Sequence, residues 1–187
     1  MKARLLSTFF LASLLSGSLF FSCKPDPVTP PEPGNEEEVI TTLKLSFRDS
    51  ADASNTSTAV FKDVDGEGGQ PPVVDTIRLD ANKTYYAQVT LLDETKNPAA
   101  DITEEIEEEA NDHQLFYNIS QGNIVVSYED RDTNNPPLPL GLKTKWRTGN
   151  SGNGSIQIIL KHQAGTKNNT QTPGETDIDV TFRTEIK

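Results

Sequence analysis

Residues 177–186 read Asp-Ile-Asp-Val-Thr-Phe-Arg-Thr-Glu-Ile and show the clearest periodic pattern of the chain. Its even-numbered positions hold Ile, Val, Phe, Thr and Ile, whereas its odd-numbered positions hold Asp, Asp, Thr, Arg and Glu. Alternation with a period of two is typical of a β-strand that has one buried face and one wet face. The stretch therefore predicts a strand that covers a hydrophobic core on one side only.

The same alternation recurs along the chain. It is found at residues 39–48, 85–91, 124–128, 140–146 and 156–162, with shorter candidates at 58–64, 73–80 and 114–119. Clusters of Gly, Pro and Asn separate these segments. About eight or nine short strands predict an all-β domain over residues 39–187, an immunoglobulin-like antiparallel β-sandwich. An up-and-down barrel is the alternative arrangement.

One short acidic helix interrupts the strands within residues 101–117. Asp101 is suited to the N-cap with Glu104 three residues later, which is a capping-box spacing. Ile102, Ile106 and Ala110 recur every four residues and form a narrow apolar stripe. We expect this helix to cross from one sheet of the sandwich to the other.

The helix carries six carboxylates in nine residues. A solvated surface helix explains such a run of charge, and a cation site is the other interpretation. Glu105, Glu109 and His113 recur at four-residue spacing, so they share a face if the last turn continues. Carboxylate together with imidazole suits a divalent transition metal better than magnesium or calcium.

The only two histidines, His113 and His162, are expected on apolar strand faces, because they share parity with Leu115 and Leu160 respectively. A histidine in that position is either a core residue with one hydrogen-bond partner or a metal ligand. Both histidines lie at segment ends, where neighbouring antiparallel strands could bring them together.

The candidate metal site consists of two imidazoles and the carboxylates nearest to them in sequence. Its residues are His113, His162, Glu105, Glu109 and Asp112. Two imidazoles with one or two carboxylates match a zinc or copper site, in which further carboxylates orient the ligands.

Residues 1–22 have the organisation of a signal peptide. Lys2 and Arg4 precede an apolar run, and the segment ends at Ser22, directly before Cys23, the only cysteine of the chain. This ending resembles a loose form of the lipobox of bacterial lipoproteins, which implies that Cys23 is lipidated. An ordinary secretory signal peptide is the alternative. A lone cysteine in an exported protein cannot form an internal disulfide, and a lipid anchor explains it.

Residues 23–38 comprise Cys23, the lipidated residue, and a tether rich in Pro and Glu over residues 24–38 that separates the anchor from the domain. The formal charge of the whole chain is −11. Loss of residues 1–22 removes two basic residues and no acid, so the charge becomes −13. This balance argues against nucleic acid as a partner, and it leaves the lipid anchor as the contact with the membrane.

Catalytic motifs do not stand out in the sequence. There is no Gly-x-Ser-x-Gly, no His-Glu-x-x-His and no glycine-rich phosphate loop. Acids are abundant, but no pair of them is singled out for glycosidase chemistry. We therefore do not expect an enzyme.

Several segments resemble a group of small Bacteroidetes envelope lipoproteins. They are residues 38–42, 63–66, 101–109, 112–117, 160–163 and 174–180. Members of this group are often labelled "type 1 periplasmic-binding fold", which implies a two-lobed α/β protein, whereas the alternation predicts a β-sandwich. The resemblance implies an outer-membrane lipoprotein, facing the periplasm or the surface, that is accessory to an uptake receptor.

Two function classes follow from the sequence. The first is a module that binds a ligand or a metal ion at the cell envelope. The second is a structural or adhesive surface domain with no small-molecule site. The two classes differ in metal content, which a measurement on the purified protein distinguishes.

Overall fold

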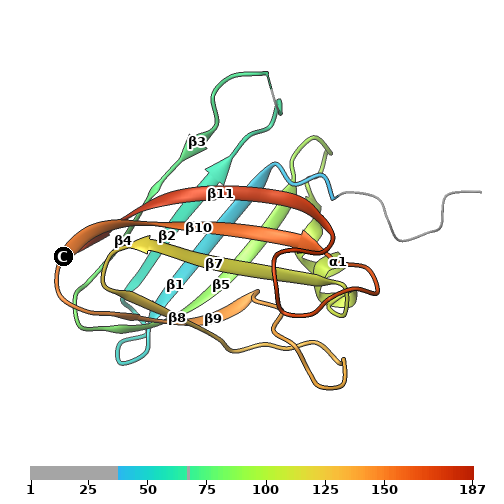
Figure 1. Ribbon diagram of the computed structural model, residues 1–187. Helices are drawn as coiled ribbons and strands as arrows, with labels where there is room; N and C mark the ends of the chain where they lie inside the picture. Colours follow the sequence, from blue (N-terminus) through green and yellow to red (C-terminus); the bar gives the residue numbers. More distant parts are fainter. Residues whose placement is uncertain (1–37, 67) are drawn as a thin grey trace, which may run out of the picture. The chain divides into compact units, whose positions relative to one another are not determined.

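The computed structural model describes residues 38–66 and 68–187, and this part of the chain is an all-β sandwich. Eleven strands and one helix are found in these residues, and the strands form two sheets of seven and four (Figure 1). The predicted all-β sandwich with one short acidic helix is therefore confirmed. The predicted signal peptide, Cys23 and the tether up to residue 37 lie outside the described residues.

The seven-stranded sheet has the order β3-β2-β1-β5-β9-β8, and β6 pairs with the end of β5. Its strands are β1 (Thr42–Asp49), β2 (Thr56–Lys62), β3 (Val73–Val74), β5 (Thr84–Asp93), β6 (Ala100–Asp101), β8 (Ile124–Tyr128) and β9 (Lys143–Thr148). All pairs in this sheet are antiparallel. Side chains alternate between the core and the outer face, as a period of two requires.

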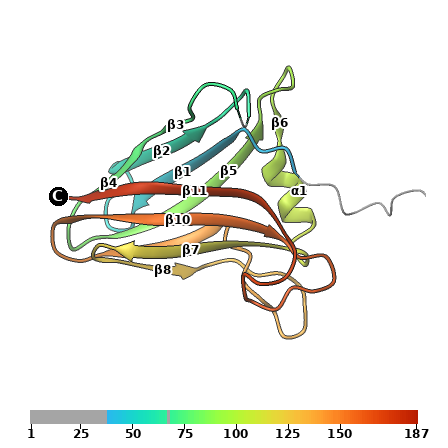
Figure 2. The ribbon, with the colours of Figure 1, turned by 45° about the horizontal axis from the view of Figure 1, so that its top comes forward.

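The four-stranded sheet has the order β4-β11-β10-β7. Its strands are β4 (Thr76–Leu79), β7 (His113–Gln121), β10 (Gly152–His162) and β11 (Glu175–Ile186). The pairs β10–β11 and β7–β10 are antiparallel, whereas β4 and β11 run parallel. The two sheets lie as separate layers when the ribbon is turned (Figure 2).

Each of the nine predicted segments overlaps at least one strand, and two details were not foreseen. The predicted strand at residues 73–80 divides at Asp75, so that β3 joins one sheet and β4 the other. The division has a local cause: the backbone NH of Asp75 donates to the carbonyl of Val60, and its carboxylate accepts from the NH of Val60. The two-residue strand β6 is too short to show alternation.

Helix α1 (Ile102–Glu108) connects β6 of the larger sheet to β7 of the smaller one, which confirms the predicted crossover. Asp101 is the N-cap as predicted, but its carboxylate accepts from the NH of Thr103 and not from that of Glu104. Ile102 and Ile106 are buried against the core. The helix ends at Glu108, so its face does not extend to His113, the first residue of β7.

The core lies between the sheets, and aromatic side chains form its centre. Trp146, Tyr85, Phe47 and Phe182 are the largest side chains with almost no exposed surface. The ring of Phe47 meets that of Trp146 edge to face, with centroids 5.0 Å apart. The indole NH of Trp146 donates to the hydroxyl of Thr144, so its one polar group is satisfied inside the core.

A β-bulge interrupts the pairing of β10 with β11 near one end. Leu160 pairs with Ile178, but the next residue, Lys161, pairs with Thr176. Asp177 is therefore an extra residue on β11 without an opposite residue on β10. A bulge of this kind redirects the side chain of the extra residue. The amine of Lys161 donates to the carbonyl of Gly174 and the hydroxyl of Thr176, beside the bulge.

Within residues 38–66 and 68–187, the one helix, α1, is far too short to cross a membrane.

Candidate metal centre

The structure brings His113 and His162 together at one end of the sandwich. His113 begins β7, His162 ends β10, and the two are directly opposite in the antiparallel pairing of these strands. Their rings stack with centroids 4.5 Å apart and planes 20° apart. Figures 1 and 2 show this end, where α1 lies beside the end of β10 and the start of β11.

Both histidines are buried, with 0% of His113 and 4% of His162 exposed. Within the described part of the chain, Nε2 of His113 and Nδ1 of His162 are buried without a hydrogen-bond partner. Buried polar atoms are normally hydrogen-bonded, and the exceptions often mark a functional site or an ion. Each ring of the pair therefore has a buried nitrogen that is available to bind an ion.

Glu109 is the predicted carboxylate that lies closest to the histidine pair. It is the C-cap of α1, and its exposed side chain places Oε2 3.9 Å from Nδ1 of His113. Its backbone carbonyl lies 3.3 Å from the same nitrogen. When Nδ1 carries the proton and donates to this carbonyl, the lone pair is on Nε2. One ligand atom each from Glu109, His113 and His162 lie within 4.8 Å of one another.

A second carboxylate, that of Asp177, approaches the pair from the bulge. Its Oδ2 atom lies 3.9 Å from Nε2 of His113, and its side chain is fully buried. Sequence reasoning missed this residue, because strict alternation in residues 177–186 assigned it to the wet face. The bulge breaks the alternation, and no residue type in this stretch signals it in advance.

The other two predicted carboxylates are placed elsewhere. Glu105 is exposed one turn earlier on α1, and it is not part of the group. The carboxylate of Asp112 accepts from the backbone NH of Gly165, while its carbonyl accepts from the NH of Gln163. Asp112 thus holds the loop between β10 and β11 against the end of α1, and this loop follows directly after His162.

A buried ion pair fixes the loops around the histidines. The amine of Lys167 lies 2.8 Å from the carboxylate of Asp132, and both side chains have almost no exposed surface. The same amine donates to the carbonyl of Ala110. Lys167 therefore links the loop after β10, the loop after β8 and the segment after α1. Burial is the main cause that lowers the pKa of Lys167, and Asp132 opposes this effect.

The pKa of His113 is lowered from 6.5 to about 4, chiefly by burial and next by the neighbouring His162. The carbonyl of Glu109 opposes this shift. His113 is therefore a neutral imidazole at neutral pH. Neutral imidazole is the form that binds a metal ion, so the site does not need to release a proton from this residue first.

The residues present fit a small divalent transition metal. Zinc bonds to histidine nitrogen and carboxylate oxygen are about 2.0–2.2 Å long, so tetrahedral ligand atoms lie about 3.4 Å apart. Closing the observed group from 4.8 Å to that separation requires side-chain movements on the order of 1 Å. The side chain of Glu109 is exposed and can make such a movement.

No protein-family model matches the chain, and no curated protein and no solved structure matches it.

Proposed function

We propose that the chain is an envelope lipoprotein whose β-sandwich binds a divalent transition metal ion, zinc or copper, as a non-catalytic module. The observation that carries this proposal is the stacked pair His113 and His162. Two buried imidazoles, each with a ring nitrogen that lacks a hydrogen-bond partner among the described residues, lie beside two carboxylates. Desolvating these nitrogens costs free energy, and a metal ion would recover it.

In this proposal His113 and His162 supply the nitrogen ligands, and Glu109 or Asp177 supplies oxygen. The two carboxylates lie near different nitrogens of His113, Glu109 beside Nδ1 and Asp177 beside Nε2. The carboxylate that does not bind the metal would orient the imidazole through its other nitrogen, as is common around metal-bound histidines.

The leader and tether provide the cellular setting of the proposal. Cys23 would carry the lipid that holds the protein at the outer membrane, and residues 24–38 would separate the domain from the bilayer. Metal capture at this place fits a module that is accessory to an outer-membrane uptake receptor, as the resemblance to small Bacteroidetes lipoproteins implies.

A thermal-denaturation experiment tests metal binding. The purified protein is stripped with a chelator, dialysed and melted with and without zinc or copper(II). A ligand at 100 times its Kd stabilises the native state by about 2.7 kcal/mol. For a domain of this size we expect Tm to rise by roughly 5–10 °C. His113→Asn and His162→Asn should each abolish the rise, and metal content measured by mass spectrometry should fall with it.

Three carboxylate variants locate the oxygen ligand. Glu105→Gln changes the same charge on the same helix but lies outside the group, so it should keep the full rise in Tm. Glu109→Gln and Asp177→Asn should differ, and the variant that loses more metal affinity identifies the ligand. An unchanged melting curve with both metals at saturation contradicts the proposal and favours the structural or adhesive domain.

A further inference from the structure

The outer face of the seven-stranded sheet has a charge opposite to that of the whole chain. Cations occupy six of its outward positions, namely Lys44, Arg48, Lys62, Lys143, Lys145 and Arg147. Asp and Glu occupy none of the outward positions of β1, β2, β5, β8 and β9, all of which are described. This face, called the basic face below, belongs to a protein with a net charge of −11.

Half of these cations are already paired. Lys62 pairs with Glu94, Lys143 with Glu107, and Lys145 with Glu129. The other three, Lys44, Arg48 and Arg147, make no side-chain hydrogen bond and no ion pair within the described residues. A guanidinium offers five donors in a planar fork that matches carboxylate and sulfate oxygens. Arg48 and Arg147 are therefore available to an anionic ligand.

An exposed aromatic ring lies at the centre of the basic face. Tyr86 is opposite Arg48 on one side and opposite Lys145 on the other in the register of β1, β5 and β9. The residue Tyr86 is 44% exposed, so its ring is open to solvent. Arg48 and Tyr86 are among the residues that line a hollow of about 460 Å³, and Ser46, Gln88, Lys143 and Glu129, the partner of Lys145, are others.

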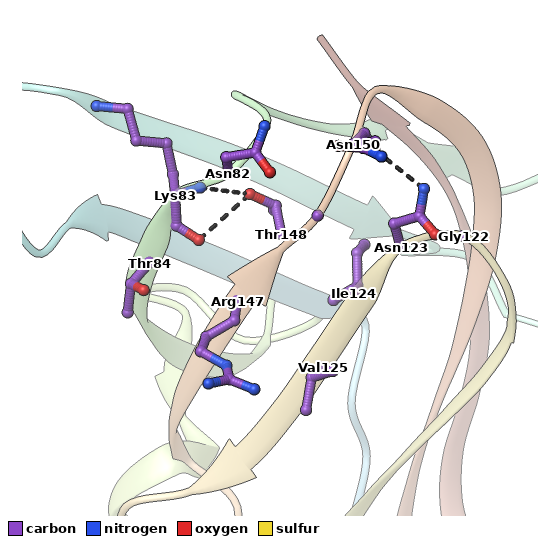
Figure 3. Close-up of a pocket in the computed structure, with 11 residues that line it drawn as sticks. Asn82, Lys83, Thr84, Gly122, Asn123, Ile124, Val125, Arg147, Thr148 and Asn150 are labelled. Atoms are coloured by element: carbon purple, nitrogen blue, oxygen red, sulfur yellow. Dashed lines mark hydrogen bonds between the residues drawn. The ribbon is translucent and has the colours of Figure 1, made fainter.

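A second hollow lies further along β5 and β9. It has a volume of about 780 Å³, and Thr84, Val125, Arg147 and Asn150 are among the residues that line it (Figure 3). Figure 3 shows Arg147 and Val125 beside each other on β9 and β8, where they are register partners. Thr84 and Arg147 lie one outward position beyond Tyr86 and Lys145, so the second hollow lies on the same face of the sheet as Tyr86.

From these observations we propose that the basic face binds an anionic polysaccharide, a sugar polymer that carries carboxylate or sulfate groups. Arg48 and Arg147 would bind the anionic groups, Tyr86 would pack against a sugar ring, and Gln88 with Ser46 would bond to hydroxyls. This site shares no residue with the histidine pair, so it is independent of metal binding.

The spacing of the unpaired cations favours a polysaccharide over a nucleic acid as the ligand. Strand and residue spacings in a sheet put Arg48 and Arg147 about 12 Å apart. Phosphates repeat about every 3.4 Å along a nucleic acid strand, which calls for a denser row of cations. The net negative charge of the chain would also repel a long polyanion of that charge density. This repulsion is weaker for a sparsely charged glycan.

Native gel electrophoresis with polymer embedded in the gel tests the proposal. Hyaluronate supplies carboxylates and κ-carrageenan supplies sulfate esters, both sparsely spaced along the polymer, and neutral dextran is the control. We expect at least one anionic polymer to retard the protein and dextran to leave its migration unchanged. The polymer that retards it identifies which anionic group the face prefers. No retardation by either anionic polymer at low salt overturns the proposal.

Variants show whether the retardation comes from this face. Arg48→Gln and Arg147→Gln should each weaken binding about tenfold, because each loses a charge-assisted hydrogen bond. Tyr86→Ala should weaken it about fivefold through loss of the ring surface. Arg183→Gln makes the same charge change at an exposed residue on β11, in the other sheet, and should leave binding unchanged.

Two results would contradict the assignment. If Arg183→Gln weakens binding as much as Arg48→Gln does, the attraction is a property of the net charge and not of the basic face. If single-stranded DNA binds equally well and Tyr86→Ala has no effect, the face recognises polyanions in general and not a glycan.

Discussion

The rings of His113 and His162 stack almost in parallel at the end of the β7–β10 pair, with centroids 4.5 Å apart. This contact depends on strand register, because the two residues are direct partners across the sheet. A slip of one residue would turn every side chain of one strand to the opposite face and separate the pair. Leu115 and Leu160 are also register partners and lie in the core, so hydrophobic burial fixes the register that joins the histidines.

Gly174→Ala should displace His162 and weaken both the fold and metal binding. Gly174 has a positive φ of 78°, and an added Cβ would overlap the carbonyl oxygen of His162. Gly165→Ala is the matched control, because Gly165 has a φ of 62° but an added Cβ would have no atom within 4 Å. The control should lose only about 1–2 kcal/mol for the left-handed backbone.

We expect Gly174→Ala to lose clearly more than this control in urea denaturation. Zinc titration of both variants then measures the effect on the site. Equal losses of stability in the two variants would show that the loop around residue 174 shifts to relieve the overlap and that His162 keeps its position.

Lys167→Met should be strongly destabilising, because it leaves the carboxylate of Asp132 buried without its cation. Removing one partner of a buried ion pair costs about 3–5 kcal/mol. The double variant Lys167→Met with Asp132→Asn should cost less than the sum of the single substitutions. Lys145→Met is the control, since Lys145 and Glu129 form an exposed pair 3.6 Å apart, for which about 0–1 kcal/mol is expected.

Chemical denaturation of the wild type, Lys167→Met, Asp132→Asn and the double variant gives the coupling energy between Lys167 and Asp132. Additive losses for Lys167 and Asp132 would mean that the buried pair contributes no mutual stabilisation. A loss at Lys145 as large as that at Lys167 would mean that burial does not distinguish the two pairs.

Asp49→Asn should make the unfolding free energy less dependent on acid pH. The pKa of Asp49 is lowered below 3.8, mainly by the backbone NH of Ala51 and next by the amine of Lys83. Because the folded pKa is below the unfolded one, the unfolded state binds more protons in this range. The stabilisation is therefore complete above the unfolded pKa and is lost as pH falls through the folded pKa.

The wild-type protein should be more stable than Asp49→Asn at pH 7, and the difference should shrink below about pH 4. Urea denaturation at a series of pH values from 7 to 3 measures this difference. A gap that stays constant over the whole series would contradict the role given to the Asp49 carboxylate.

Cys23→Ala should release the protein from membranes. If Cys23 carries the lipid anchor, the wild-type protein incorporates labelled palmitate and partitions into the detergent phase, whereas the variant does neither. Ser22→Ala keeps a small residue before the cysteine and should behave like the wild type. A Cys23→Ala variant that remains equally membrane-bound would refute the lipoprotein proposal.

Local sequence pattern was enough to predict most of the strands and the start of the helix. Alternation in residues 177–186 and in the other predicted strands reflects local chemistry. A sheet with one solvent-exposed face is stable only when every second side chain is apolar and buried. The N-cap at Asp101 is equally local, since its carboxylate bonds to an NH two residues away. The placement of both histidines at strand ends was also readable from the same pattern.

Tertiary packing determines which carboxylates lie near the histidines. The helix stops at Glu108, which leaves Glu105 away from the pair. Packing of the loop after β10 engages Asp112 with backbone NH and carbonyl groups. The bulge directs Asp177 inward, against its parity in the sequence. The position of Asp177 depends on the pairing between β10 and β11, and a periodicity within one strand carries no information about the partner strand.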